Sequence, residues 1–185
     1  QILPLINKPL IKIITGVRRS GKSYLMRQIM EELTARGIAK QQMVYINMEL
    51  IAFDFIHDYK ALYHYISQQF RSVKGKKYIL IDEIQEVTHW EKAISSFFAE
   101  EQYDLFITGS NAKLLSSEMA SLLSGRYVSI HLYTLSLSEY IQFKENQPLP
   151  KQEAFYEYLH FGGFPVIHYL DYNEELIFQY INSLY

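Results

Sequence analysis

The sequence predicts an α/β fold in which a parallel β-sheet is flanked by helices. Short apolar runs typical of buried strands alternate with segments whose apolar residues recur at helical spacing through most of the 185 residues. The strand-like runs cover residues 10–14, 43–47, 78–82, 105–108 and 127–132, and the helical segments cover residues 21–36, 59–70, 90–98 and 114–123. This alternation is typical of crossover connections between parallel strands, so we expect a five-stranded parallel sheet.

Local signals support the individual elements. In the first helix, Leu25, Ile29 and Leu33 form an apolar stripe, and Gly37 follows where a left-handed residue would end it. Segment 90–98 carries apolar residues at the first, fourth, fifth, eighth and ninth positions, which is one buried helix face. Segment 127–132 alternates apolar and polar residues, as a half-covered strand should.

The pattern changes after the fifth strand. Ser136 and Glu139 form a capping box at the start of a short helix, and residues 146–150, Asn-Gln-Pro-Leu-Pro, are typical of a linker. A helical aromatic segment, a break at Gly162-Gly163 and a further helical segment follow. We therefore expect a core domain over residues 1–146 and a helical region over residues 147–185 that belongs to a longer protein.

Composition narrows the class of protein. The net charge of −2 and the pI near 6.3 argue against a domain covered by a broad nucleic-acid-binding surface. The chain has no cysteine, which fits a reducing compartment, and no apolar run long enough to cross a bilayer. We expect a cytoplasmic protein without a membrane partner.

Residues 16–23 read G-V-R-R-S-G-K-S, a complete match to the phosphate-binding pattern G-x-x-x-x-G-K-[ST]. Glycines let backbone N–H groups wrap a polyphosphate, Lys22 brings a positive charge to the β- and γ-phosphates, and Ser23 offers a hydroxyl to Mg²⁺. The loop joins a strand to a helix, whose N-terminus favours an anion. The residues expected to bind nucleotide are Gly16, Val17, Arg18, Arg19, Ser20, Gly21, Lys22, Ser23 and Tyr24. Arg18 and Arg19 either add positive potential for phosphate or face solvent.

The strand over residues 78–82 ends in Asp82-Glu83. An acid that closes a buried strand lies at the carboxyl edge of the sheet, beside the phosphate loop, where Mg²⁺ needs a carboxylate. Glu83 is then placed to polarise a water molecule for attack on the γ-phosphorus. The alternative is that the two acids only complement the dipole of a following helix.

Two further polar positions are candidates for the same site. Ser110 or Asn111 follows the fourth strand and either contacts the γ-phosphate or caps the next helix. Arg126 precedes the fifth strand and either acts as an arginine finger on the nucleotide of a neighbouring subunit or packs on the surface.

Four segments, G-V-R-R-S-G-K-S, I-L-I-D-E-I-Q, I-T-G-S-N and L-S-G-R-Y, resemble the AAA+ superfamily of P-loop ATPases in their order and spacing. Trp90-Glu91, residues 110–118, L-S-L-S-E-Y from Leu135 and F-G-G-F-P from Phe161 resemble a prokaryotic AAA+-like family that carries a C-terminal domain of unknown function. The resemblance implies the strand order 5-1-4-3-2 and a helical lid that begins near Lys151.

The resemblance also implies roles for individual residues. Asp82 and Glu83 would be the Mg²⁺ and water-activating acids, Asn111 or its neighbours the first sensor, and Arg126 the finger. We find no second-sensor arginine in residues 147–185.

Motifs and resemblance together predict an ATPase that uses Mg²⁺ and works as a conformational switch or motor. The expected catalytic residues are Lys22, Glu83, Asn111 and Arg126, the expected metal ligands are Ser23 and Asp82, and a homo-oligomer would use Arg126 in trans. A P-loop kinase, or a non-hydrolysing scaffold for protein or DNA partners, remains an alternative. Glu83 argues against the kinase, since a base directed at water is a liability for a phosphotransferase.

Overall fold

A computed structural model describes residues 2–109, 122–144, 149–170 and 173–184. The chain falls into two compact units: a core unit of residues 1–16 and 22–131, and a helical unit of residues 17–21 and 132–185. The expected boundary at residues 146 and 147 and most of the expected helix 114–123 lie outside the described residues. Both stay predictions.

The core unit is built on a five-stranded parallel sheet in the order β2-β3-β4-β1-β5. The strands are β1 (Ile11–Thr15), β2 (Met43–Asn47), β3 (Lys77–Asp82), β4 (Tyr103–Gly109) and β5 (Tyr127–His131). This confirms the predicted fold class and strand order, which is the same order read from the opposite edge. Strand β1 is paired with β4 on one side and with β5 on the other, so the loop that follows β1 begins in the interior of the sheet edge and not at its end.

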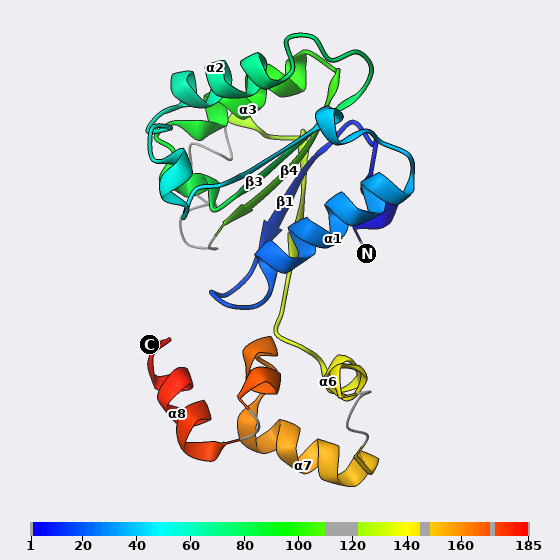
Figure 1. Ribbon diagram of the computed structural model, residues 1–185, viewed down its shortest axis with the longest axis vertical. Coiled ribbons are helices and arrows are strands. Elements are labelled where there is room, and N and C mark those ends of the chain that lie inside the picture. Colours follow the sequence, from blue (N-terminus) through cyan, green and yellow to red (C-terminus); the bar gives the residue numbers. More distant parts are fainter. Residues whose placement is uncertain (1, 110–121, 145–148, 171–172, 185) are drawn as a thin grey trace. The chain divides into compact units, whose positions relative to one another are not determined.

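Helices cover the two faces of this sheet. Figure 1 shows α2 (Tyr59–Gln69) and α3 (Trp90–Ala99) together over one face and α1 (Lys22–Ala35) over the other. Short 3-10 turns link the elements, namely η1 (Leu3–Leu5), η2 (Lys40–Gln42), η3 (Ile51–Phe53) and η4 (Ile84–Glu86). Gly37 follows α1 with a φ of 82°, the left-handed conformation expected from the sequence.

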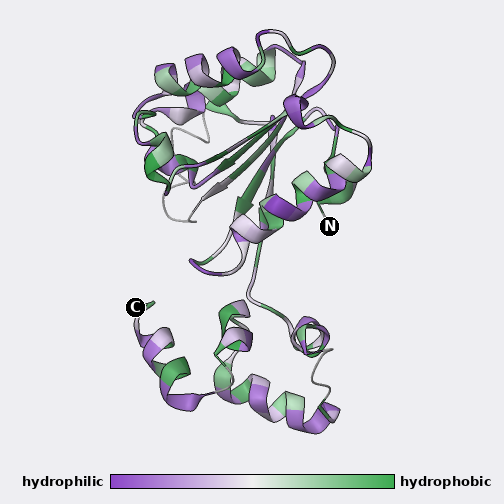
Figure 2. Ribbon diagram, viewed as in Figure 1, coloured by the Kyte–Doolittle hydropathy of each residue, from purple (hydrophilic) through white to green (hydrophobic). Residues whose placement is uncertain are grey.

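The core has two layers because the side chains of a strand alternate between its faces. Ile13, Ile81 and Ile107 belong to the same cluster as buried residues of α2 and α3, whereas α1 buries Met26, Ile29 and Leu33. Figure 2 shows apolar strands between helices whose other side is hydrophilic. Strands β1 and β3 are buried along their whole length, while β5 is only partly covered, as its alternating sequence predicts.

The one polar residue of the first apolar run, Lys12, is fully buried in β1. Its ammonium group forms an ion pair with Asp104 and donates to the Lys8 carbonyl at 2.8 Å. The other carboxylate oxygen of Asp104 accepts from the Asn7 backbone N–H at 2.7 Å. Burial lowers the pKa of Lys12 and the paired Asp104 opposes this shift, so the buried charge is compensated and ties the segment before β1 to the sheet.

The helical unit contains α6 (Leu137–Phe143), α7 (Lys151–Phe161), η5 (Pro165–Tyr169) and α8 (Glu174–Asn182). The predicted capping box is confirmed, since the Ser136 N–H donates to the Glu139 carboxylate at 2.8 Å while the Ser136 hydroxyl accepts from the Glu139 N–H. The L-S-L-S-E-Y and F-G-G-F-P segments meet, because the Leu135 N–H donates to the Gly163 carbonyl at 2.8 Å. No helix among the described residues is long and apolar enough to span a membrane.

Candidate nucleotide-binding site

The loop between β1 and α1 has an unusual backbone. Gly16, Arg19 and Gly21 all have positive φ, and the value of 101° at Gly21 is one that residues with a Cβ rarely adopt. The Ser20 N–H donates to the Val17 carbonyl at 3.2 Å and closes a tight turn. The Ser20 hydroxyl is buried and has no hydrogen-bond partner among the described residues. A buried hydroxyl of this kind needs a partner, and a phosphate oxygen would supply one.

Lys22 is buried at the first position of α1 and joins two sequence motifs. Its ammonium group donates to the Gly16 carbonyl at 3.3 Å and lies 3.4 Å from Oε1 of Glu83. The phosphate loop and the acidic end of β3 therefore meet, as predicted from strands that end at the same edge of a parallel sheet.

Asp82 is fully buried at the end of β3, and both of its carboxylate oxygens accept hydrogen bonds from neighbouring strands. The Thr108 hydroxyl on β4 donates to one oxygen, and the Tyr45 hydroxyl on β2 donates to the other at 3.2 Å. Burial and the adjacent Asp82 charge raise the pKa of Tyr45 to about 12, so this phenol stays protonated and remains a donor at neutral pH. These two contacts fix the orientation of the Asp82 carboxylate.

Glu83 follows in a left-handed conformation, with φ of 55° and ψ of 51°. Its backbone N–H donates to the Thr108 hydroxyl oxygen at 3.1 Å, and its Oε2 accepts from the Gln85 side-chain amide at 2.6 Å. Non-glycine residues rarely adopt this backbone conformation, so the surrounding contacts must hold Glu83 in it. The turn directs the Glu83 carboxylate toward Lys22.

Sequence reasoning did not single out three residues of this site, namely Tyr45, Thr108 and Gln85. Thr108 ends the predicted fourth strand and Gln85 belongs to the I-L-I-D-E-I-Q segment, so both carried a positional signal. Tyr45 carried none, because its contact with Asp82 depends on the pairing of β2 with β3.

Of the remaining two predicted catalytic residues, the structure describes Arg126 alone. Asn111 lies outside the described residues, so the sensor stays a prediction. Arg126 is exposed and donates from Nη1 to the Ser95 hydroxyl on α3 at 3.1 Å, while its carbonyl accepts from the Ile11 N–H at 2.9 Å. It therefore lies beside the start of β1, whereas the phosphate loop follows the end of that strand.

The donor set fits magnesium. Ser23 offers a hydroxyl and Asp82 a carboxylate, and Mg²⁺ prefers oxygen ligands while keeping several waters and substrate phosphates in its coordination shell. Among the described residues, no group of three or more His, Cys, Asp or Glu side chains is arranged to hold a metal. A metal bound here would depend on the nucleotide as well as on the protein.

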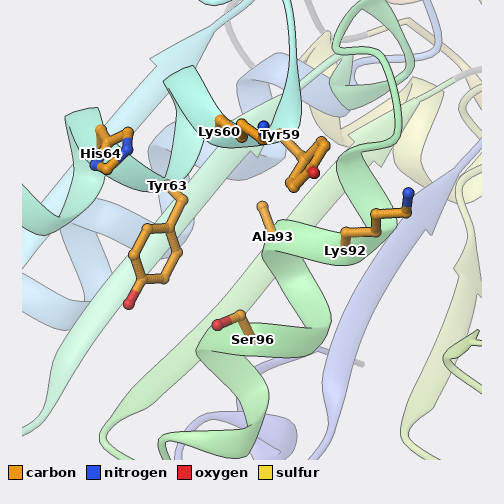
Figure 3. Close-up of a pocket in the computed structure, with 7 residues that line it drawn as sticks. All are labelled: Tyr59, Lys60, Tyr63, His64, Lys92, Ala93 and Ser96. Atoms are coloured by element: carbon orange, nitrogen blue, oxygen red, sulfur yellow. The ribbon is translucent and has the colours of Figure 1, made fainter.

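A separate groove of about 180 Å³ lies between α2 and α3 (Figure 3). Tyr59, Lys60, Tyr63 and His64 from α2 line it together with Lys92, Ala93 and Ser96 from α3. The ammonium groups of Lys60 and Lys92 lie 5.9 and 5.2 Å from the centre of the Tyr59 ring, respectively. None of the predicted nucleotide-site residues lines this groove.

A parallel sheet with a phosphate loop after the interior strand β1, and an acidic pair at the end of β3 with β4 between these two strands, defines the class of P-loop nucleotide-binding proteins. Residues 8–141 match the protein family described as AAA domain, and the chain belongs to this family. The solved structures described below share its P-loop nucleotide-binding fold.

Two curated relatives cover most of the chain. An uncharacterised protein of Haemophilus influenzae is 40% identical over 169 residues, which are 90% of this chain and 42% of the relative. Uncharacterised protein MJ1544 of Methanocaldococcus jannaschii is 31% identical over 192 residues, covering 95% of this chain and 41% of the relative. The chain thus spans about two fifths of the length of these relatives.

Solved structures show the same fold at low sequence identity. A mutant of Thermotoga maritima RuvB has a TM-score of 0.58 at 16% identity and covers 86% of this chain and 52% of its own. The FIGL-1 AAA domain in complex with ADP gives 0.54 at 11% identity, with 82% and 55% covered. PCH-2 of C. elegans gives 0.53 at 13% identity, with 77% and 40% covered.

Proposed function

We propose that this protein hydrolyses ATP in a Mg²⁺-dependent reaction and uses the cycle as a conformational switch or motor. The observation that carries the proposal is the 3.4 Å approach of the Lys22 ammonium group to the Glu83 carboxylate. This contact places a phosphate-binding cation beside a candidate general base at one edge of the sheet. The fold shared with the ADP-bound FIGL-1 AAA domain supports adenine nucleotide as the ligand.

Each residue then has a defined task. The backbone of Gly16–Ser23 cradles the phosphates, and Lys22 exchanges its contact with the Gly16 carbonyl for the β- and γ-phosphates. Ser23 and Asp82 would hold Mg²⁺, directly or through water, with Asp82 oriented by Tyr45 and Thr108. When bound, the ion neutralises charge that develops on the phosphates.

Glu83 acts on the nucleophile. It orients a water molecule for in-line attack and accepts its proton as the water oxygen bonds to the γ-phosphorus. The bond from the γ-phosphorus to the oxygen that bridges the β- and γ-phosphates breaks, and ADP leaves with that electron pair. The products are ADP and inorganic phosphate, and no further reactant is needed.

The proposal extends to assembly and location. Asn111 or its neighbours would sense the γ-phosphate, and Arg126 would act on the nucleotide of an adjacent copy in a homo-oligomer. The activity would take place in the cytoplasm, and residues 147–185 would form part of a helical lid. A protein or DNA partner would receive the conformational change.

Two variants test the chemistry. We expect Lys22→Ala to abolish saturable ATP binding, because the loop loses its only buried cation among the described residues. Glu83→Gln should retain ATP binding, because the amide keeps the size of the side chain, while turnover falls by about a hundredfold or more with loss of the base. Titration with a fluorescent ATP analogue and phosphate release, each with Mg²⁺, measure the two quantities.

The same measurements separate the alternatives. Phosphate release without an added acceptor excludes a phosphotransferase as the main activity. Saturable binding with no turnover in the full-length wild-type protein would identify a scaffold. Unchanged turnover in Glu83→Gln would show that another group activates the water.

A further inference from the structure

Gln85 lies in η4, two residues after Glu83, and its side chain is half-buried. Its Nε2 donates to Oε2 of Glu83 at 2.6 Å and has a weaker contact of 3.5 Å with Glu86. An ionised carboxylate can only accept hydrogen bonds, so the amide nitrogen must be the atom that faces it. The Oε1 of the same amide is buried and has no hydrogen-bond partner among the described residues.

Glu83 is therefore held at both oxygens, by Lys22 at Oε1 and by Gln85 at Oε2. Bound nucleotide would affect these two contacts differently. Lys22 is required by the β- and γ-phosphates, so a bound triphosphate competes for its charge. Gln85 belongs to the same short turn as Glu83 and has no positive charge to offer a phosphate.

We propose that Gln85 is the positioning residue that orients the Glu83 carboxylate once nucleotide has engaged Lys22. By holding Oε2, the amide leaves Oε1 of Glu83 to accept the proton of the attacking water. The inference rests on the proposed role of Glu83 as general base and assigns that base its orienting partner.

Gln85→Leu tests this role, because leucine has a similar volume but no hydrogen-bonding group. We expect kcat for ATP hydrolysis to fall about tenfold, a part of the hundredfold or more that a general base contributes. The KM for ATP and the Kd for ADP should stay within about twofold, because Gln85 contacts no group expected to bind phosphate. Gln68→Leu, the same change at an exposed position of α2, should leave kcat unchanged and is the matched control.

A double-mutant cycle distinguishes positioning from a general structural effect. If Gln85 acts through Glu83, adding Gln85→Leu to Glu83→Gln should not slow the residual single-turnover rate further. A comparable loss in both backgrounds, or a kcat for Gln85→Leu within twofold of wild type, would overturn the inference. Lack of turnover in the wild-type protein would instead overturn the proposed function, and preserved ADP binding shows that the variant has folded.

Discussion

At the scale of single residues, the Thr108 hydroxyl is the group that couples the acidic pair to the neighbouring strand. It donates to the Asp82 carboxylate and accepts from the Glu83 N–H at 3.1 Å. Thr108 and Asp82 are both fully buried. One hydroxyl therefore satisfies a buried charge and a backbone donor at the turn that directs Glu83.

This arrangement predicts that Thr108→Val is destabilising although valine has nearly the same shape. The substitution leaves a buried carboxylate oxygen and an N–H group unpaired, which costs about 1–3 kcal/mol for each such group. We expect urea unfolding to report a lower free energy of unfolding, and ATP turnover to fall because Asp82 loses one of its two orienting donors.

Thr108→Ser is the matched control, since it keeps the hydroxyl and removes only a methyl group. It should remain close to wild type in turnover and lose less stability than the valine variant. Equal stability of the valine and serine variants would show that the hydroxyl contributes nothing to this turn.

At the scale of elements, the helical unit depends on a close backbone approach between the segment before α6 and the segment after α7. The Leu135 N–H bonds to the Gly163 carbonyl at 2.8 Å, and the Tyr158 hydroxyl donates to the Leu135 carbonyl at 3.0 Å. A Cβ atom at Gly163 would lie 2.2 Å from the Leu135 carbonyl oxygen. Only glycine permits this contact, which gives a physical reason for the F-G-G-F-P segment.

We therefore predict that Gly163→Ala loosens the packing of α6 against α7. Overpacking against backbone typically costs about 1–3 kcal/mol, so amide exchange in residues 135–163 should accelerate about tenfold or more. Gly125→Ala is the control, because a Cβ there meets nothing within 4 Å and the only cost is its φ of 72°. Hydrogen exchange followed by mass spectrometry measures both, and equal protection of residues 135–163 in the two variants would contradict the prediction.

The sequence predicted features that depend on residues close together in the chain or on strand ends that share one edge of the sheet. It did not predict contacts that depend on the register between strands. The capping box of Ser136 and Glu139 needs only residues three apart, and it forms as expected. The meeting of Lys22 with Glu83 followed from strand ends that share one edge of a parallel sheet. The contact of Tyr45 with Asp82 requires the register of β2 against β3, which residue types and spacing do not specify.

At the scale of the whole molecule, the position of Arg126 determines whether its side chain can reach the nucleotide bound to its own chain. Its carbonyl pairs with Ile11 at the start of β1, and the phosphate loop begins after Thr15 at the other end. Four residues of strand span about 13 Å, which is longer than an arginine side chain. Its guanidinium group is also bonded to Ser95 on α3. Any action of Arg126 on ATP therefore requires a second copy of the chain.

If Arg126 acts on a neighbouring copy, ATP turnover should depend on the association of subunits. If Arg126 completes the site of a neighbour, ATP turnover per subunit should rise with protein concentration as subunits associate, and Arg126→Ala should remove the rise. An arginine finger supplied in trans can contribute about 10³–10⁵ in kcat, so the loss should be large while ATP binding to each subunit is retained. Turnover measured over a dilution series, together with gel filtration, tests this expectation.

Ser95→Ala separates catalysis from local structure in this experiment. It removes the 3.1 Å contact of the Arg126 side chain within its own chain but leaves the guanidinium group available to a neighbour. If Arg126 is a finger, Ser95→Ala should keep the concentration-dependent turnover that Arg126→Ala loses. If both variants lose it equally, the arginine matters for packing against α3, and the oligomer must complete its nucleotide site with another residue.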